Sequence, residues 1–161
     1  MASDEEIFKN GSTTYYWSSK FFPKKVRDDV LKFYSFVRVI DDYVDQVPSD
    51  TKNFLAVKER WEETRHDLSF ETAPVASDTL NERIIKNVQH VVRKYDIDHT
   101  WIEAFFDSMQ MDVEKHVYKT VEDSLKYMYG SAEVIGLCMS KIIGLPEEAL
   151  MYAKLQGRAM Q

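Results

Sequence analysis

The sequence predicts an all-helical protein, and three observations support this prediction. Residues that break helices are scarce, with 5 glycines and 4 prolines among 161 residues. Apolar residues recur at spacings of three and four over most of the chain, which is the period of an α-helix. A hydrophobic content of 44%, with 13% aromatic residues, is enough to bury a core. We therefore expect one helical domain over residues 1–161.

The first part of the chain predicts a lead-in followed by two helices. Residues 1–25 are polar with interspersed aromatic residues, and we expect them to be a lead-in to the first helix. Residues 26–45 have apolar positions at helical spacing and further apolar residues on the other faces, so this helix should be central. Pro48 ends the pattern. A second, amphipathic helix is predicted over residues 51–68, with an apolar face formed by Phe54, Val57, Trp61, Thr64 and Leu68.

Two more helices are predicted in the middle of the chain. The third begins near Ser77 or Asp78, because either side chain can cap a helix. Its apolar positions are Leu80, Ile84, Val88, Val91 and Val92. The fourth begins near Asp98 and carries apolar residues as far as Val117.

The last part of the chain predicts a fifth and a sixth helix. Thr120 with Asp123 resembles a capping box that opens a helix over residues 120–143, and Gly144 is a suitable stop. A sixth helix begins after Pro146 and is still in period at Gln161. We therefore expect the sequence to end within a helix.

Charge and cysteine content exclude several classes of protein. The net charge is −6 and the basic residues are scattered, which argues against nucleic-acid binding. The single cysteine, Cys138, excludes an internal disulfide and a cysteine-based zinc site, and its apolar surroundings favour a buried side chain. The sequence has no signal-peptide pattern and no apolar run of about 18 residues. We expect a cytoplasmic protein, and peripheral contact with a membrane stays open as an alternative.

Asp41 and Asp45 are the first candidates for chemistry. Their spacing of four places both carboxylates on one helix face, with Arg38 one turn before Asp41 and Tyr34 a further turn back. Such a pattern is more often solvated surface charge. Here the helix is apolar nearly all round, and two neighbouring carboxylates repel unless a cation compensates them. A Mg²⁺ ion shared with substrate phosphates would provide that compensation.

The residues around this pair resemble a known family. Residues 34–45, YSFVRVIDDYVD, are similar to the first aspartate-rich motif of squalene, dehydrosqualene and phytoene synthases, the head-to-head prenyltransferases. Residues 12–15 and 21–23 resemble the segment before that motif, and residues 109–112 and 127–137 resemble two later blocks in the same order. The resemblance covers essentially the whole chain and is strongest to the archaeal phytoene synthase-like branch.

The resemblance implies a fold and an activity. The fold is an isoprenoid synthase-like helical bundle around a central cavity. The favoured reaction is the Mg²⁺-dependent condensation of two geranylgeranyl diphosphates to phytoene. Two alternatives stay open: a squalene or dehydrosqualene synthase that uses farnesyl diphosphate, and a non-catalytic domain that binds diphosphate or a partner.

The resemblance also implies roles for individual residues. Asp41 and Asp45 would bind Mg²⁺, and Arg38, Tyr34 and Tyr127 would be catalytic. The substrate-binding residues would be Ser12, Thr14, Arg38, Ser131 and Ile135. The small or apolar residues Gly130, Ser131, Ala132, Ile135 and Gly136 would leave room for an isoprenoid chain, although the residues by themselves favour close helix packing.

The chain also departs from the family pattern. Thr13 stands where a basic residue is usual, and Glu133 stands where other branches have a small residue. The second aspartate-rich motif is expected directly after Gln161 and is not in the sequence. We therefore expect this chain to be an N-terminal portion of such an enzyme, and the activity of the chain alone stays open.

Overall fold

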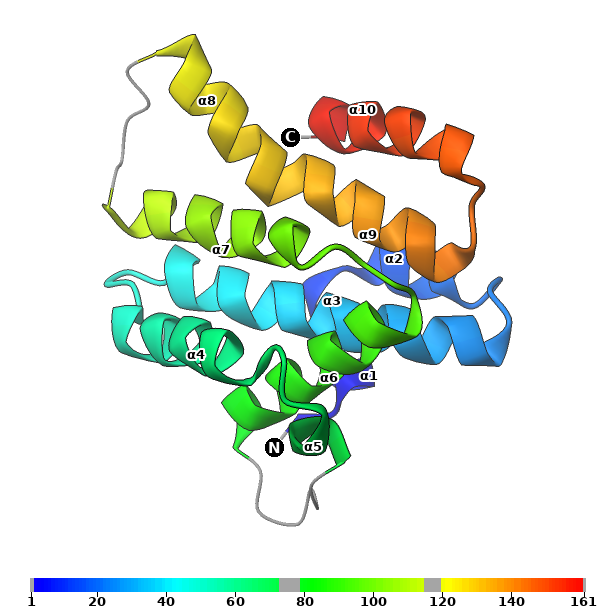
Figure 1. The fold of residues 1–161 in the computed structure, drawn as a ribbon, viewed down its shortest axis with the longest axis horizontal. Helices are drawn as coiled ribbons and strands as arrows, with labels where there is room; N and C mark the ends of the chain where they lie inside the picture. Colours follow the sequence, from blue (N-terminus) through cyan, green and yellow to red (C-terminus); the bar gives the residue numbers. More distant parts are fainter. Residues whose placement is uncertain (1, 73–78, 115–119, 161) are drawn as a thin grey trace. The chain divides into compact units, whose positions relative to one another are not determined.

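The computed structural model describes residues 2–72, 79–114 and 120–160 (Figure 1). The elements assigned to these residues are all helices, which confirms the all-α fold class. The chain divides into two compact units, Met1–Lys94 and Tyr95–Gln161, called unit 1 and unit 2 below. Within the described residues, no helix is both long and apolar enough to cross a bilayer.

Unit 1 is organised around its longest helix. Its elements are α1 (Asp4–Gly11), α2 (Thr13–Ser19), α3 (Lys24–Asp45), α4 (Thr51–Thr64), α5 (Leu68–Thr72) and α6 (Leu80–Lys94). Helix α3 contacts α1, α4 and α6, as predicted for a central helix. Its buried side chains include Val30, Ser35 and Val39, and the full buried set spans about 220° of the helix circumference. Because several helices surround α3, residues on different faces of it can be buried at once.

Residues 1–25 were predicted to be a lead-in to the first helix. This prediction is wrong, because the segment contains two helices, α1 and α2. The backbone N–H of Glu6 donates to the Ser3 hydroxyl, and the Glu6 carboxylate accepts from the Ser3 backbone N–H, which is a complete capping box. Ser12 caps α2 by accepting from the backbone N–H of Tyr15. These caps compensate for the weak apolar periodicity of both helices.

The second predicted helix is shorter than expected. Helix α4 ends at Thr64, and Leu68 is 74% exposed instead of completing the apolar face. The other four predicted face residues are buried: Phe54, Val57, Trp61 and Thr64. The third helix, α6, is present, but the cap residues predicted for it, Ser77 and Asp78, lie outside the described residues.

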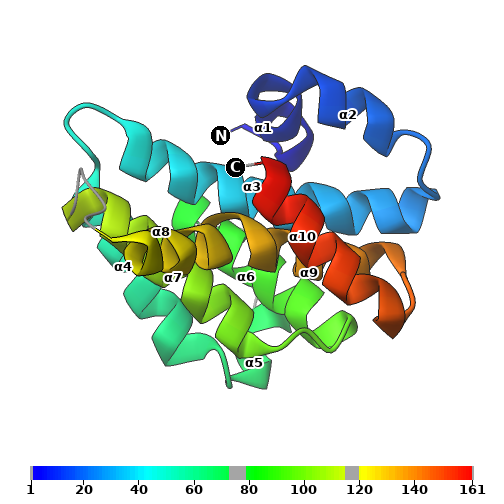
Figure 2. The same cartoon turned by 90° about the horizontal axis from the view of Figure 1, so that it is seen from above.

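Unit 2 contains the remaining elements. These are α7 (His99–Glu114), α8 (Val121–Met128), the π-helical turn η1 (Tyr129–Glu133), α9 (Val134–Ile143), the 3₁₀ turn η2 (Glu147–Ala149) and α10 (Leu150–Met160). Helix α7 contacts α8, η1 and α9, and α10 contacts η1 and α9 (Figure 2). Thr120 caps α8 as predicted, and Gly144 ends α9 with φ 75°.

The predicted fifth helix is divided by the π-helical turn. At this turn the backbone N–H of Val134 donates to the carbonyl of Tyr129, a five-residue step in place of the usual four. Such turns are frequent at functional sites. Further along, Cys138 is fully buried, and burial raises the pKa of its thiol, so the prediction of a buried side chain is confirmed.

Candidate functional site

Five polar residues of α3 form two neighbouring faces: Tyr34, Arg38, Asp41, Asp42 and Asp45. With about 100° between successive residues, Tyr34, Asp41 and Asp45 point to one side of Arg38, and Asp42 points to the other. Asp45 is exposed, while the other four are partly buried. Arg38 therefore lies at the border between the predicted metal face and a second face that contains Asp42.

Arg38 holds a carboxylate on each side. One terminal guanidinium nitrogen lies 3.1 Å from Asp41 Oδ2, and the other lies 2.6 Å from Asp42 Oδ1. The sequence did not require Asp42 to share this site, because it is rotated by about 100° from Asp41. The long arginine side chain bridges that angle, so Asp42 is a site residue that sequence reasoning missed.

Helix α1 ends against the same part of α3. A Cβ atom on Gly11 would lie 2.5 Å from the Tyr34 hydroxyl and 3.1 Å from Arg38 Cδ, so only glycine leaves both side chains in place. The ring of Phe8 packs on Tyr34, with ring centroids 4.0 Å apart. Ser12, the residue after Gly11, is thereby brought to the region of the aspartate helix. A role for Gly11 at the site could have been suspected from the sequence, because Gly11 directly precedes Ser12, a predicted substrate-binding residue.

The surroundings of the Tyr34 hydroxyl favour its protonated form. Burial raises the pKa of Tyr34, and the carboxylates of Asp41 and Asp42 raise it further, although Arg38 opposes them. A neutral phenol is a hydrogen-bond donor at neutral pH. Tyr34 can therefore donate to an anionic group bound near Arg38.

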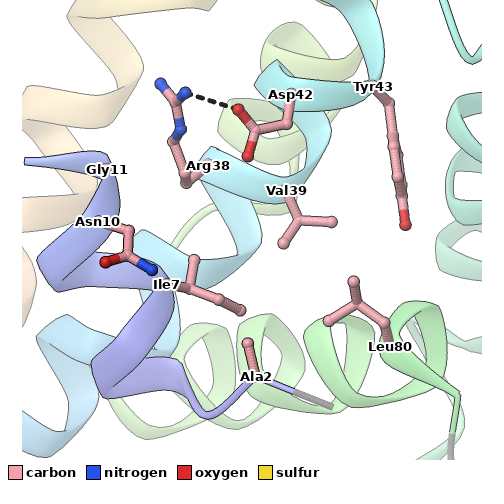
Figure 3. Close-up of a pocket in the computed structure, with 9 residues that line it drawn as sticks. All are labelled: Ala2, Ile7, Asn10, Gly11, Arg38, Val39, Asp42, Tyr43 and Leu80. Carbon is pink, nitrogen blue, oxygen red and sulfur yellow. Dashed lines mark ion pairs between the residues drawn. The ribbon is translucent and has the colours of Figure 1, made fainter. Parts of the chain in front are cut away.

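A pocket of about 300 Å³ lies beside Arg38 on the Asp42 side of α3 (Figure 3). Ion-paired Arg38 and Asp42 lie at one edge of the pocket, and aliphatic side chains point into it from α1, α3 and α6. Its lining residues are Ala2, Ile7, Asn10, Gly11, Arg38, Val39, Asp42, Tyr43 and Leu80. The Tyr43 hydroxyl donates to Asn81 at 2.7 Å, which anchors one wall. Asp41 and Asp45 do not line this pocket.

The Gly11→Ala substitution tests the close approach of α1 and α3. We expect the free energy of unfolding to change by less than about 1 kcal/mol, because the clash falls on side-chain atoms that can move. If the site binds a prenyl diphosphate, as the family resemblance implies, the affinity for a prenyl thiodiphosphate, measured by calorimetry with Mg²⁺ present, should fall about tenfold because Tyr34 and Arg38 are displaced. Unchanged affinity in Gly11→Ala would show that this contact does not position the site.

The other predicted substrate-binding and catalytic residues are distributed over both units. Thr14 lies in the first turn of α2 and is exposed. In unit 2, Tyr127 lies on α8, Ser131 on η1 and Ile135 on α9, and all three are partly buried. Among the described residues, the buried Ser131 hydroxyl oxygen has no hydrogen-bond partner. An unsatisfied buried hydroxyl is costly, so it is a candidate for contact with a ligand or water.

Gly130 and Gly136 do not leave the open space that the resemblance implies. A Cβ on Gly130 would lie 2.1 Å from the Ala104 carbonyl oxygen of α7, and a Cβ on Gly136 would lie 2.5 Å from the Ala153 carbonyl oxygen of α10. Both glycines let helices pack closely, which is the interpretation that the residues by themselves favoured. For these two positions the expectation of room for an isoprenoid chain is wrong.

Glu133 is fully buried, with 0% exposure, and is held by α10. Its carboxylate pairs with the Nε of Arg158, and Lys154 Nζ lies 3.4 Å from its second oxygen. Lys154 also lies over the Tyr129 ring. Two cations from a neighbouring helix allow this carboxylate to be buried.

Possible metal ligands are limited to small sets in the described part of the chain. No group of three or more histidine, cysteine, aspartate or glutamate side chains is arranged to hold a metal ion in residues 2–72, 79–114 and 120–160. Asp41 and Asp45 together offer two carboxylates. Such a pair fits Mg²⁺, which is commonly bound by one or two carboxylates together with substrate phosphates and water.

Comparison with known proteins gives consistent matches. A sequence model of the squalene/phytoene synthase family matches residues 8–161. The 15-cis-phytoene synthase of Enterobacter agglomerans is 28% identical over 141 residues, which cover 88% of this chain and 48% of that protein. The 4,4'-diapophytoene synthase of Staphylococcus haemolyticus is 23% identical over 158 residues, covering 97% of this chain and 53% of that protein. The presqualene diphosphate synthase of Rhodopseudomonas palustris is 27% identical over 153 residues, covering 92% and 51%. The chain thus spans about half the length of these relatives.

Proposed function

We propose that this chain, which belongs to the squalene/phytoene synthase family, supplies the first metal-binding half of a site for Mg²⁺-dependent head-to-head condensation of two prenyl diphosphates. The favoured substrate is geranylgeranyl diphosphate and the favoured product is phytoene. Family membership supports the class of reaction, and the arrangement of unit 1 supports the roles given to single residues.

One observation carries most of this proposal. The end of α1 and the middle of α3 meet at Gly11, beside Tyr34 and Arg38. Helical spacing on α3 places a phenol donor, a guanidinium and Asp41 in one region of unit 1, and this contact brings the end of α1 beside them. In a chain with a net charge of −6, a diphosphate needs such local donors together with a cation.

The proposed division of labour follows from the chemistry of each side chain. Asp41 and Asp45 would hold Mg²⁺, which when bound would neutralise diphosphate charge and so assist its departure. Arg38 would donate to diphosphate oxygens, and Asp42 would keep its guanidinium oriented. Ser12 retains its hydroxyl proton when it caps α2, so it can still donate to a phosphate oxygen.

The proposed roles in unit 2 concern the hydrocarbon part of the substrate. Tyr127 and Ile135 would contact the isoprenoid chain, and Ser131 would use its unsatisfied hydroxyl. Exclusion of water by such apolar side chains would protect carbocations during the reaction. Thr14 would contribute a further hydroxyl on the exposed side of α2.

Product analysis tests the substrate and separates the alternatives. The full gene product is incubated with Mg²⁺ and either geranylgeranyl or farnesyl diphosphate, and the extracted hydrocarbons are identified by chromatography and mass spectrometry. We expect phytoene from the longer substrate. A product from farnesyl diphosphate alone would instead identify a squalene or dehydrosqualene synthase. Binding of a prenyl thiodiphosphate without any hydrocarbon product would favour a non-catalytic binding domain.

A further inference from the structure

The chain concentrates positive charge in one segment. Residues 7–27 contain five basic residues, at positions 9, 20, 24, 25 and 27, and no aspartate or glutamate, while the whole chain has a net charge of −6. Although basic residues are scattered through most of the sequence, this stretch is an exception. It includes α2 and the short turn that leads into α3 (Figure 2).

Large aromatic side chains are exposed in the same segment. Trp17 is 54% exposed, Phe21 is 92% exposed and Tyr15 is 48% exposed. Helix α2 is anchored, because Tyr16 and Ser19 are buried and the Tyr16 hydroxyl donates to Glu5 at 2.6 Å. The exposed aromatic side chains therefore belong to a segment that is fixed to the protein.

One lysine of this segment lies over two aromatic rings, and two more follow at the start of α3. The Lys20 ammonium lies 4.1 Å from the Trp17 ring centroid and 4.9 Å from that of Tyr16. Lys24 and Lys25 are both exposed at the start of α3, just beyond Phe21. We call the following set the aromatic–lysine corner: Tyr15, Trp17, Lys20, Phe21, Lys24 and Lys25.

We propose that the aromatic–lysine corner docks this protein on the surface of an anionic lipid bilayer. Aromatic rings would enter the interface between headgroups and acyl chains, and the lysine ammonium groups would remain at the level of the lipid phosphates. An acidic protein surface is the less favoured partner, because lysine is depleted from the centres of protein–protein interfaces. Lysines flanking exposed tryptophan and phenylalanine are instead typical of segments that lie in a membrane interface.

Charge and apolar burial should both contribute to docking. A lysine near an anionic membrane surface strengthens binding about fivefold, and this contribution weakens as added salt screens it. Burial of Trp17 and Phe21 adds a term that does not depend on salt. The two contributions can therefore be separated by ionic strength and by substitution.

Vesicle sedimentation tests the proposal on the purified 161-residue protein. We expect binding to vesicles of mixed phosphatidylcholine and phosphatidylglycerol, weaker binding to phosphatidylcholine alone, and loss of most binding at high salt. Lys24→Gln/Lys25→Gln should lower the partition coefficient about 25-fold. The matched control Lys52→Gln/Lys126→Gln removes two exposed lysines outside the corner and should leave binding unchanged.

The apolar contribution has its own pair of variants. Trp17→Ala/Phe21→Ala should lower partitioning at least about tenfold even at high salt. Val121→Ala/Leu125→Ala removes two exposed apolar side chains from α8 and should have no effect. In vesicles with brominated acyl chains, tryptophan fluorescence should be quenched. Trp17→Phe should remove most of the quenching, since Trp61 is buried and Trp101 is partly buried and lies outside the corner. Circular dichroism verifies that each variant is folded.

Three results would overturn the proposal. One is equal binding to neutral and anionic vesicles, and another is a control variant that loses as much binding as its matched corner variant. The third is binding to poly-glutamate with no binding to vesicles, which would identify an acidic polypeptide as the partner. None of these measurements depends on turnover, so their outcome is independent of the proposed condensation reaction.

Discussion

Asp41→Asn and Asp45→Asn are each expected to lower kcat/KM for hydrocarbon formation by about 10³-fold or more, because each removes a charge that would hold Mg²⁺. The free energy of unfolding should change by less than about 1 kcal/mol. The side chains of Arg38 and Asp41 are more than one third exposed, and ion pairs of this kind contribute little to stability. Asp45 is exposed at the end of α3, so its substitution should also have little effect on folding.

Turnover is measured in the full gene product, and Mg²⁺-dependent binding of a prenyl thiodiphosphate is measured by calorimetry in the 161-residue chain. Asp28→Asn is the matched control, since Asp28 is an exposed carboxylate on the same helix. If either Asp41→Asn or Asp45→Asn kept full turnover, the metal assignment would be wrong. A loss of turnover accompanied by unfolding would be detected by circular dichroism.

Arg158→Ala is expected to destabilise unit 2 by about 3 kcal/mol, the largest stability effect that we predict. Glu133 is fully buried, and removal of Arg158 would leave its carboxylate with incomplete compensation from Lys154. An uncompensated buried charge costs far more than the loss of an exposed ion pair. Urea unfolding followed by circular dichroism measures the change.

Substitution of the other partner of this ion pair, Glu133, should destabilise unit 2 much less. In Glu133→Gln the two cations remain, but both side chains are about 40% exposed and can be hydrated. We expect a loss of about 1 kcal/mol, from the weaker hydrogen bond of the amide. Equal losses in Arg158→Ala and Glu133→Gln would contradict this account, because the asymmetry follows from the difference in burial between the carboxylate and the cations.

Local patterns in the sequence were sufficient for most of the helices. The apolar periodicity of residues 26–45 predicted α3 to within two residues, and Gly144 ended α9 as expected. Helices α1 and α2 were missed because both are short and their apolar residues are adjacent in sequence instead of recurring at a spacing of three or four. The Ser3 and Glu6 capping box was readable in the sequence, so this error was avoidable. The π-helical turn at residues 129–133 was not, because close packing of Gly130 on α7 is a tertiary contact.

The sequence by itself determined the family of this protein and the helix face shared by Arg38, Asp41 and Asp45, because motif order and helical spacing are local properties. Only the tertiary structure decided that Asp42 shares Arg38 and that Gly11 lies against Tyr34. It also decided that the carboxylate of Glu133 is buried. These features depend on where a long side chain reaches and on which backbones come close together. Residues far apart in the chain set both, so helical spacing alone cannot predict them.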